Sequence, residues 1–287
     1  MNIISIFKDF PTQEKCIKHL EQLRWVNGVY CPYCKSDNTY KIEDRHRHHC
    51  NGCKKSFSVT VHTIMHDTRL PLQKWFLAIS LIANAKKGLS SRQLARDLDL
   101  PVKTAYSLSQ RIRKAMIGEK SSFLKGIIEI DETYIGGKPR YKNSGAKRGR
   151  GTSKTMVVGA VERDGCVIAK SYNRFNQKDV RNLILENVDI DNSKVYTDEY
   201  RAYSRTSSIV KHSSVNHSRR QYVNGNVHTN TIEGFWATVK RAYYGQHHHY
   251  SKKYTDLYIS EAVFKYNHRK HSQDVVCNSI FSGLLYV

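Results

Sequence analysis

The chain has 287 residues, 39% of them hydrophobic, enough for one large domain or two to three smaller ones with an ordinary core. Its 47 Lys and Arg residues outnumber 25 Asp and Glu residues, and the net charge of +22 is spread over the whole length, which favours a polyanionic partner. The sequence has no apolar run of bilayer length, no secretory-signal pattern and no lipidation motif, so we expect nucleic acid rather than a membrane as the partner, and a cytoplasmic location.

A helical segment is predicted for residues 1–28. Apolar and polar side chains mix at helical spacing from residue 10 onward, and Gly28 ends the pattern.

A zinc ribbon is predicted for residues 29–62. Two C-x-x-C pairs lie fifteen residues apart, and they consist of Cys31, Cys34, Cys50 and Cys53. Each pair forms a tight turn that points two thiolates at one place, and four thiolates complete the tetrahedral shell of structural Zn²⁺. The alternative is two redox-active pairs, but the spacing and the odd total of seven cysteines favour a metal site in a reducing compartment.

The polar segment between the two cysteine pairs is expected to form a β-ribbon. Three histidines lie near the second pair: His46, His48 and His49. Because four cysteines already complete the zinc shell, we interpret these histidines as surface residues or nucleic-acid contacts.

A helix-turn-helix-like DNA-binding segment is predicted for residues 68–120. Its helical stretches begin at Pro71, at Ser90 or Ser91, and at Pro101. Polar residues of the last stretch recur at three- and four-residue steps and share a face that could meet DNA. They are Lys103, Ser107, Gln110, Arg111 and Lys114, with Arg92 and Thr104 nearby. The alternative is an ordinary three-helix bundle with solvated charges.

Residues 123–287 are predicted to form one α/β domain. Strands are expected over 126–135, 155–162, 165–172, 193–198 and 208–212, and helices over 177–188, 229–243 and 252–268. This order is typical of a mixed sheet with helices packed on it. The Asp164-Gly165 pair predicts a hairpin turn between the second and third strands.

Two stretches of this domain carry basic residues and no acidic one. Residues 200–232 form the longer stretch, and residues 138–154 form a glycine-rich loop soon after Asp131. Solubilising loops are the alternative, but their position beside the candidate carboxylates favours a phosphate-binding groove. In the glycine-rich loop we expect DNA contacts from Lys147, Arg148 and Arg150.

Three acidic residues are candidate metal ligands. Asp131 lies inside an apolar strand, Asp198 ends another, and Glu233 lies near the start of a helix. Carboxylates on such rigid elements could hold paired Mg²⁺ (or Mn²⁺) ions, which activate an oxygen nucleophile and neutralise the leaving oxygen in phosphodiester chemistry. Lys240, two helical turns after Glu233, could hold a DNA phosphate beside them.

Other acids compete for these roles. Glu129 shares the strand face of Asp131 and is a rival or a helper, whereas Glu132 should point away. Two further competitors are Glu199, beside Asp198, and Glu261, on the last predicted helix.

Several polar and aromatic residues flank the predicted helix that carries Glu233. His228 and Asn230 could orient a substrate, while Trp236 is expected in the core. The run 247–249 consists of three histidines, which we interpret as a polar loop contacting DNA, because three consecutive side chains cannot easily converge on one ion.

Three segments of this domain, DETYIGGK, VYTDEYRAY and VHTNTIEGFWATVKR, resemble the DDE transposases of bacterial insertion sequences, and specifically their zinc-ribbon, ISXO-type subgroup. The resemblance extends over nearly the whole chain. It implies an RNase H-like catalytic domain, Mg²⁺ held by Asp131, Asp198 and Glu233, and Lys240 as the associated basic residue. It also implies cleavage at the ends of a mobile element and transfer of the 3′-hydroxyl into target DNA.

The expected partners are therefore the terminal inverted repeats and the target DNA, with a homo-oligomer joining two ends. Two other functions stay open: an RNase H-like nuclease that only hydrolyses, and a zinc-ribbon DNA-binding regulator in which the acidic set is structural.

Overall fold

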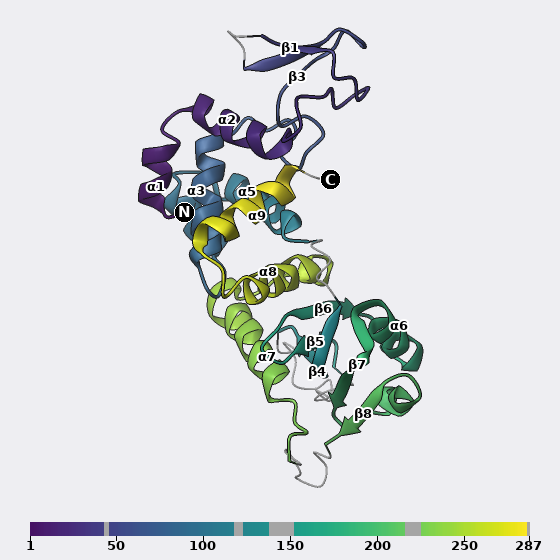
Figure 1. The fold of residues 1–287 in the computed structure, drawn as a ribbon. Helices are drawn as coiled ribbons and strands as arrows, with labels where there is room; N and C mark the ends of the chain where they lie inside the picture. The colour runs from purple at the N-terminus through teal and green to yellow at the C-terminus, as the bar shows by residue number, and fades with distance from the viewer. Residues whose placement is uncertain (43–45, 118–122, 138–151, 216–224, 286–287) are drawn as a thin grey trace. The chain divides into compact units, whose positions relative to one another are not determined.

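The computed structural model describes residues 1–42, 46–117, 123–137, 152–215 and 225–285 (Figure 1). The chain divides into two units. Unit 1 comprises Met1–Gly118 and Lys270–Val287, and unit 2 comprises Glu119–Arg269. No helix within the described ranges is long and apolar enough to cross a membrane.

Unit 1 is built around helices whose apolar stripes face one another. They are α1 (Ile3–Asp9), α2 (Gln13–Arg24), α3 (Leu72–Asn84), α4 (Ser91–Asp97), α5 (Val102–Ala115) and α9 (Gln273–Leu285). The predicted stripe of α3 is buried, including Trp75, Phe76 and Ile79. The helix predicted within residues 10–28 is α2, and Gly28 follows it with a φ of +103°, which a residue with a side chain rarely adopts.

Helix α9 corrects the predicted extent of the α/β domain. That domain is predicted to extend to residue 287, but α9 packs against α2, α3 and α5 of unit 1. The ring centroids of Phe281 and Phe76 are 4.3 Å apart. Gly283 approaches the carbonyl of Ala115 so closely that a Cβ would overlap it. The apolar face of α9 therefore completes the core of the N-terminal helices.

Helices α4 and α5 lie within the segment predicted to be helix-turn-helix-like, and they pack against each other. Ser90 caps α4, since its hydroxyl accepts a hydrogen bond from the backbone N–H of Gln93 at 3.2 Å. The polar face predicted for α5 is wrong at one position. Gln110 is only 8% exposed, because it lies on the side of α5 that joins the core.

The predicted ribbon is a three-stranded antiparallel sheet of β1 (Thr39–Ile42), β2 (Arg47–Cys50) and β3 (Ser56–Phe57). The interpretation of His48 as a surface residue is wrong. Its side chain is buried, its Nε2 lies 2.8 Å from a carboxylate oxygen of Glu21, and its ring stacks on Phe57. His48 therefore joins the ribbon to α2.

Unit 2 contains a five-stranded mixed sheet in the order β6-β5-β4-β7-β8. The strands are β4 (Leu124–Ile135), β5 (Thr155–Glu162), β6 (Val167–Tyr172), β7 (Val188–Thr197) and β8 (Lys211–Ser214). The first three in chain order form an antiparallel meander, while β7 and β8 run parallel to β4 and to each other. This α/β arrangement is the RNase H-like fold expected from the sequence, and the hairpin turns at Asp164 as predicted.

Helices cover both faces of this sheet (Figure 1). Helix α6 (Gln177–Asn187) packs on one face, and α7 (Asn230–Ala242) and α8 (Thr255–Asn267) pack on the other. Trp236 of α7 is buried, as expected. A Cβ at Gly159 of β5 would lie 2.9 Å from the Trp236 ring, so a glycine is needed there for α7 to approach the sheet.

Candidate metal centres and DNA-binding surfaces

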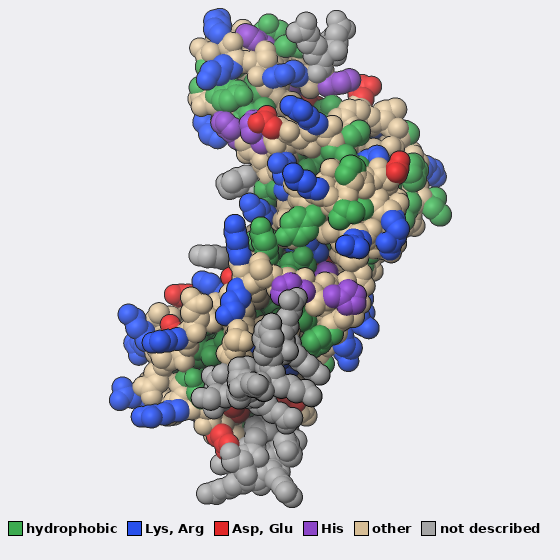
Figure 2. Space-filling view, turned by 180° about the vertical axis from the view of Figure 1, so that it is seen from behind, with side chains coloured by type: hydrophobic (Ala, Val, Ile, Leu, Met, Phe, Trp, Pro, Cys, Tyr) green, Lys and Arg blue, Asp and Glu red, His purple; other side chains and the backbone are tan. Residues whose placement is uncertain are grey.

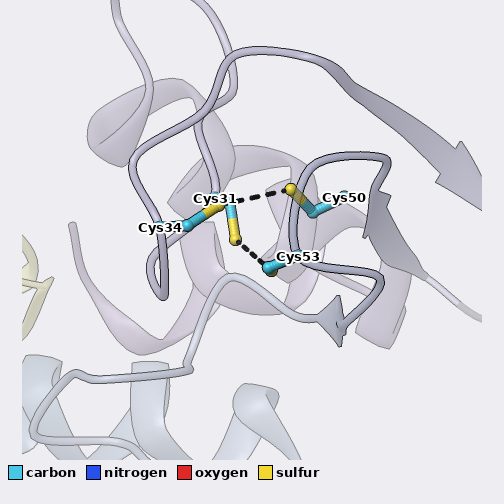
Figure 3. A group of neighbouring side chains, drawn as sticks. All are labelled: Cys31, Cys34, Cys50 and Cys53. Carbon is cyan, nitrogen blue, oxygen red and sulfur yellow. Dashed lines mark hydrogen bonds between the residues drawn. The ribbon is translucent and has the colours of Figure 1, made fainter.

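The four predicted zinc ligands converge in one cluster (Figure 3). The Sγ atoms of Cys31 and Cys53 are 3.6 Å apart, and those of Cys34 and Cys50 are 3.5 Å apart. Both turns have the same local geometry: the backbone N–H of the fourth following residue bonds to the carbonyl of Cys31 or Cys50 at 2.9 Å.

This cluster fits a tetrahedral zinc ion. Zn–S bonds of about 2.3 Å place neighbouring sulfurs about 3.8 Å apart, close to the separations seen here. The backbone N–H of Cys53 also stabilises a thiolate at Cys50, which lowers the pKa of Cys50 to about 7. All seven cysteines of the chain are free.

The acidic site lies where strand β7 ends beside β4. The parallel pairing of β4 with β7 stops at Glu129 and Tyr196, whereas β4 continues to pair with β5 as far as Ile135. Two residues beyond the last parallel pair, β4 reaches Asp131 and the β7 chain reaches Asp198. The register of the parallel strands therefore brings these two carboxylates together.

The four predicted catalytic residues of unit 2 line one pocket of about 450 Å³. Asp131 lies on β4, Asp198 directly follows β7, and Glu233 and Lys240 come from α7. Oε1 of Glu233 accepts a hydrogen bond of 2.9 Å from the Thr229 hydroxyl. The pocket thus combines carboxylates with a cation from a packed helix, which is a donor set suited to Mg²⁺ and phosphate.

The expectation that Glu132 points away is wrong. Carboxylate oxygens of Asp131, Glu132 and Asp198 all lie within 4.8 Å of one another, and Glu132 lines the pocket. Residues 131 and 132 face opposite sides of the sheet, but β7 no longer flanks β4 at this level, so both side chains can reach around the open edge. The buried Tyr203 hydroxyl donates to Oε2 of Glu132 at 3.2 Å.

The electrostatics of this site favour a bound cation. Burial, and then the negative charges of Glu132 and Asp198, raise the pKa of Asp131 to about 8. Burial and the same carboxylates raise the pKa of the Tyr203 hydroxyl as well, so it remains a hydrogen-bond donor. A divalent ion would remove the repulsion that makes ionisation of Asp131 unfavourable.

The other competing acids have different roles. Glu129 is fully buried and bonded to donors from Arg163 and α7. Glu199 is exposed, and Glu261 is buried on α8, where it accepts a 2.6 Å hydrogen bond from Lys265. None of these three lines the pocket that holds Asp131.

The predicted DNA contacts of unit 1 differ in exposure. Arg92 of α4 and Lys103 of α5 are exposed, whereas Arg111 is half-buried, and its Nη1 donates to the carbonyl of His66 at 3.4 Å. In Figure 2, Lys and Arg side chains occur over the visible faces of both units. The predicted contacts Lys147, Arg148 and Arg150 lie outside the described residues.

The histidines of unit 2 do not form a metal cluster within the described ranges. His247 ends a π-helical turn, Tyr243–His247, and His249 Nδ1 lies 3.3 Å from the Tyr243 hydroxyl. His228 lies beside Arg163, with 3.0 Å between its Nδ1 and the guanidinium, and Asn230 is exposed at the start of α7.

Comparison of the sequence with protein families gives two matches. The ISXO2-like transposase domain matches residues 123–267, and the transposase zinc-ribbon domain matches residues 11–56. A protein of the transposable element ISH50 from Halobacterium salinarum is 30% identical over 274 residues, which cover 88% of this chain and 90% of that protein.

Comparison with solved structures returns, among others, assemblies of the Mos1 transposase. A pre-cleavage Mos1 transpososome is 12% identical, covers 70% of this chain and 73% of its own, and superposes with a TM-score of 0.31. A Mos1 paired-end complex with Mg is also 12% identical, covers 73% and 78%, and has a TM-score of 0.27.

Proposed function

The chain belongs to the ISXO2-like transposases, and from this membership we propose that it cleaves DNA at the ends of an insertion sequence and transfers the freed 3′-hydroxyl into target DNA. The observation that carries the proposal is the pocket that Asp131, Asp198, Glu233 and Lys240 line from separate elements. The carboxylate oxygens that lie within 4.8 Å of one another there are those of Asp131, Glu132 and Asp198. A purely structural acidic set would have no need to gather mutually repelling carboxylates at an open strand edge.

We assign the ligand role to the three carboxylates from β4, the end of β7, and α7. Bound Mg²⁺ or Mn²⁺ would activate the attacking oxygen and neutralise charge on the leaving oxygen. Lys240 is exposed on α7 and would bind a phosphate oxygen of the DNA. Glu132 lies close enough to orient Asp131 and Asp198 or to share in holding the ions.

One site can serve both chemical steps, since each is a displacement at phosphorus. In cleavage, a water oxygen forms a new P–O bond while the bond to the 3′-oxygen breaks, which leaves a 3′-hydroxyl. In transfer, that 3′-hydroxyl forms a P–O bond with a target phosphodiester, and the displaced 3′-oxygen of the target takes up the proton.

Unit 1 would select the DNA ends. The cysteine cluster would hold Zn²⁺ and keep the ribbon folded, while Arg92, Lys103 and Arg111 would contact DNA together with the basic loop residues Lys147, Arg148 and Arg150. Because two ends must be joined, we propose that the protein acts as a homo-oligomer on DNA. We further propose that it works in the cytoplasm.

The test uses purified protein, Mg²⁺ and an end-labelled duplex containing the inverted repeats that flank its coding sequence. We expect nicking that leaves a 3′-hydroxyl, followed by joined products with a target plasmid. Asp131→Asn should lower both activities by about 10³-fold or more, equivalent to about 4 kcal/mol, while gel-shift affinity for the ends stays unchanged. Asp191→Asn, an exposed aspartate of β7, serves as the control.

Three outcomes would contradict the proposal. Cleavage without joined products would identify a hydrolytic nuclease. Specific binding without any cleavage by the wild-type protein would identify a regulator. Full activity of Asp131→Asn would show that the acidic pocket is not the catalytic site.

A further inference from the structure

Glu129 is a buried carboxylate that lies beside the acidic pocket and does not line it. It is fully excluded from solvent on the central strand β4, two residues before Asp131. Oε1 accepts from Arg163 Nε at 2.6 Å and from the Thr231 hydroxyl at 3.0 Å. Oε2 accepts from the backbone N–H groups of Thr231 at 2.7 Å and Ile232 at 3.0 Å. With its lone pairs engaged by these donors, Glu129 has no capacity left for a metal ion.

Through these contacts the Glu129 carboxylate, which projects from β4, lies against the N-terminus of α7, the helix that carries Glu233. The first N–H groups of a helix have no acceptor inside it, and they favour a negative charge. The N-cap residue Thr229 makes no side-chain bond to these groups, and its hydroxyl donates to Glu233 instead. A carboxylate from the neighbouring strand therefore caps α7 in place of a local side chain.

Arg163, which binds Glu129, also contacts β4, β7 and the segment before α7. Its backbone N–H donates to the carbonyl of Ile127 on β4 at 3.0 Å, and its Nη2 donates to the carbonyl of His228 at 3.1 Å. The guanidinium carbon lies 5.2 Å from the ring centroid of Tyr196 on β7. Arg163 thus neutralises Glu129 and fixes the chain that leads into α7.

We propose that Glu129 and Arg163 are positioning residues, which fix the start of α7 against β4 so that Glu233 faces Asp131. Glu129 and Asp131 are two residues apart on one strand face, and Thr231 and Glu233 are two residues apart in the first turn of the helix. The Glu129–Thr231 bonds therefore join the two ligand-bearing elements beside the ligands themselves. This inference rests on the proposed function, because it assigns Glu233 to the metal site.

The test compares Mn²⁺ binding by wild-type protein and Glu129→Gln, measured from the signal of free Mn²⁺ in electron paramagnetic resonance. The amide keeps the shape but loses the charge, and its NH₂ group would face N–H donors. We expect Glu129→Gln to bind Mn²⁺ at the acidic site about tenfold more weakly or worse. The Mg²⁺ concentration for half-maximal cleavage should rise by a similar factor, while the zinc content and the DNA affinity measured without added Mg²⁺ or Mn²⁺ stay unchanged.

Glu186→Gln, an exposed glutamate of α6, is the matched control and should bind Mn²⁺ as the wild type does. Wild-type Mn²⁺ affinity in Glu129→Gln would overturn the proposal, even if this variant is less stable. If Glu129→Gln does not fold, Arg163→Lys replaces it, since Lys keeps the charge but loses the planar fork. Unchanged Mn²⁺ affinity in that variant would overturn the proposal equally.

The readouts separate this inference from the proposed function. Wild-type protein that binds Mn²⁺ through Asp131 but never cleaves DNA would refute the transposase chemistry. The Mn²⁺ affinities of the Glu129 and Arg163 variants would still decide whether these residues position the site.

Discussion

The two candidate metal centres are built in opposite ways. The cysteine cluster takes its ligands from two turns of one small ribbon, separated by fewer than twenty residues. The acidic site takes its ligands from β4, the end of β7, and α7, which lie far apart in the sequence. A local site depends on its ion for folding, whereas a long-range site depends on the fold to hold repelling groups together.

Zinc removal should have the largest effect on stability, and it should unfold the zinc ribbon without unfolding the five-stranded sheet. Structural zinc contributes about 10–16 kcal/mol of apparent binding energy in zinc-finger peptides. With a chelator, or in Cys50→Ser, we expect residues 31–42 and 46–57 to lose protection from hydrogen exchange, while β4 and β5 keep theirs. Hydrogen exchange read by mass spectrometry checks this. Two results would contradict this contrast between the two sites: a ribbon that stays protected after zinc is removed, or a five-stranded sheet that loses protection together with the ribbon.

Arg163→Ala should destabilise unit 2 strongly, because it leaves the fully buried Glu129 carboxylate without its charge partner. Removing one partner of a buried pair costs about 3–5 kcal/mol. Urea unfolding should detect this loss, with Arg181→Ala on the exposed face of α6 as the control. Equal stability of the two variants would mean that the long-range network does not hold the site.

The pH dependence of stability should reveal strain at the acidic site. The folded protein raises the pKa of Asp131 to about 8, so the fold favours the protonated carboxyl, and stability is lost as pH rises from about 4 to about 8. Without divalent ions, Asp131→Asn should be more stable than wild type at pH 8 by on the order of 2–4 kcal/mol, and nearly equal at pH 4. Paired urea titrations at both pH values measure the difference, and Mg²⁺ should reduce it at pH 8. A constant difference would contradict the assigned pKa.

Glu132→Gln should give a smaller effect than the changes above. Loss of a residue that orients metal ligands weakens metal binding by about 10–100-fold. For Glu132→Gln we expect a loss of about tenfold, because the ligands Asp131 and Asp198 remain. The Mg²⁺ concentration for half-maximal cleavage measures this effect. Tyr203→Phe, which removes the donor to Glu132, should shift it less. Loss of activity as complete as that of Asp131→Asn would instead make Glu132 a principal ligand.

Sequence patterns predicted most of the fold, because local signals determine it. The zinc ligands follow from spacing within one ribbon, and the apolar runs located the strands that carry Asp131 and Asp198. The roles of Glu129 and Glu132 could not be predicted. Alternation along a strand gives the face of each side chain, but it does not tell where the neighbouring strand ends.

Long-range packing accounts for the other differences. Helix α9 has apolar residues that could cover either unit, and only the tertiary structure places Phe281 against Phe76. His48 looked like a surface residue within a polar segment, yet it is buried beside Glu21, on a helix that precedes the ribbon. In each case the deciding contact lies outside the local sequence window.

The central claim is that Asp131, Asp198 and Glu233 hold divalent cations together. Crystals of the protein with end DNA and Mn²⁺, measured for anomalous scattering, test it most directly. We predict manganese peaks bonded to oxygens of all three carboxylates at about 2.0–2.2 Å, and their loss in Asp131→Asn. Manganese bound elsewhere, or held at this pocket without Glu233, would contradict the account.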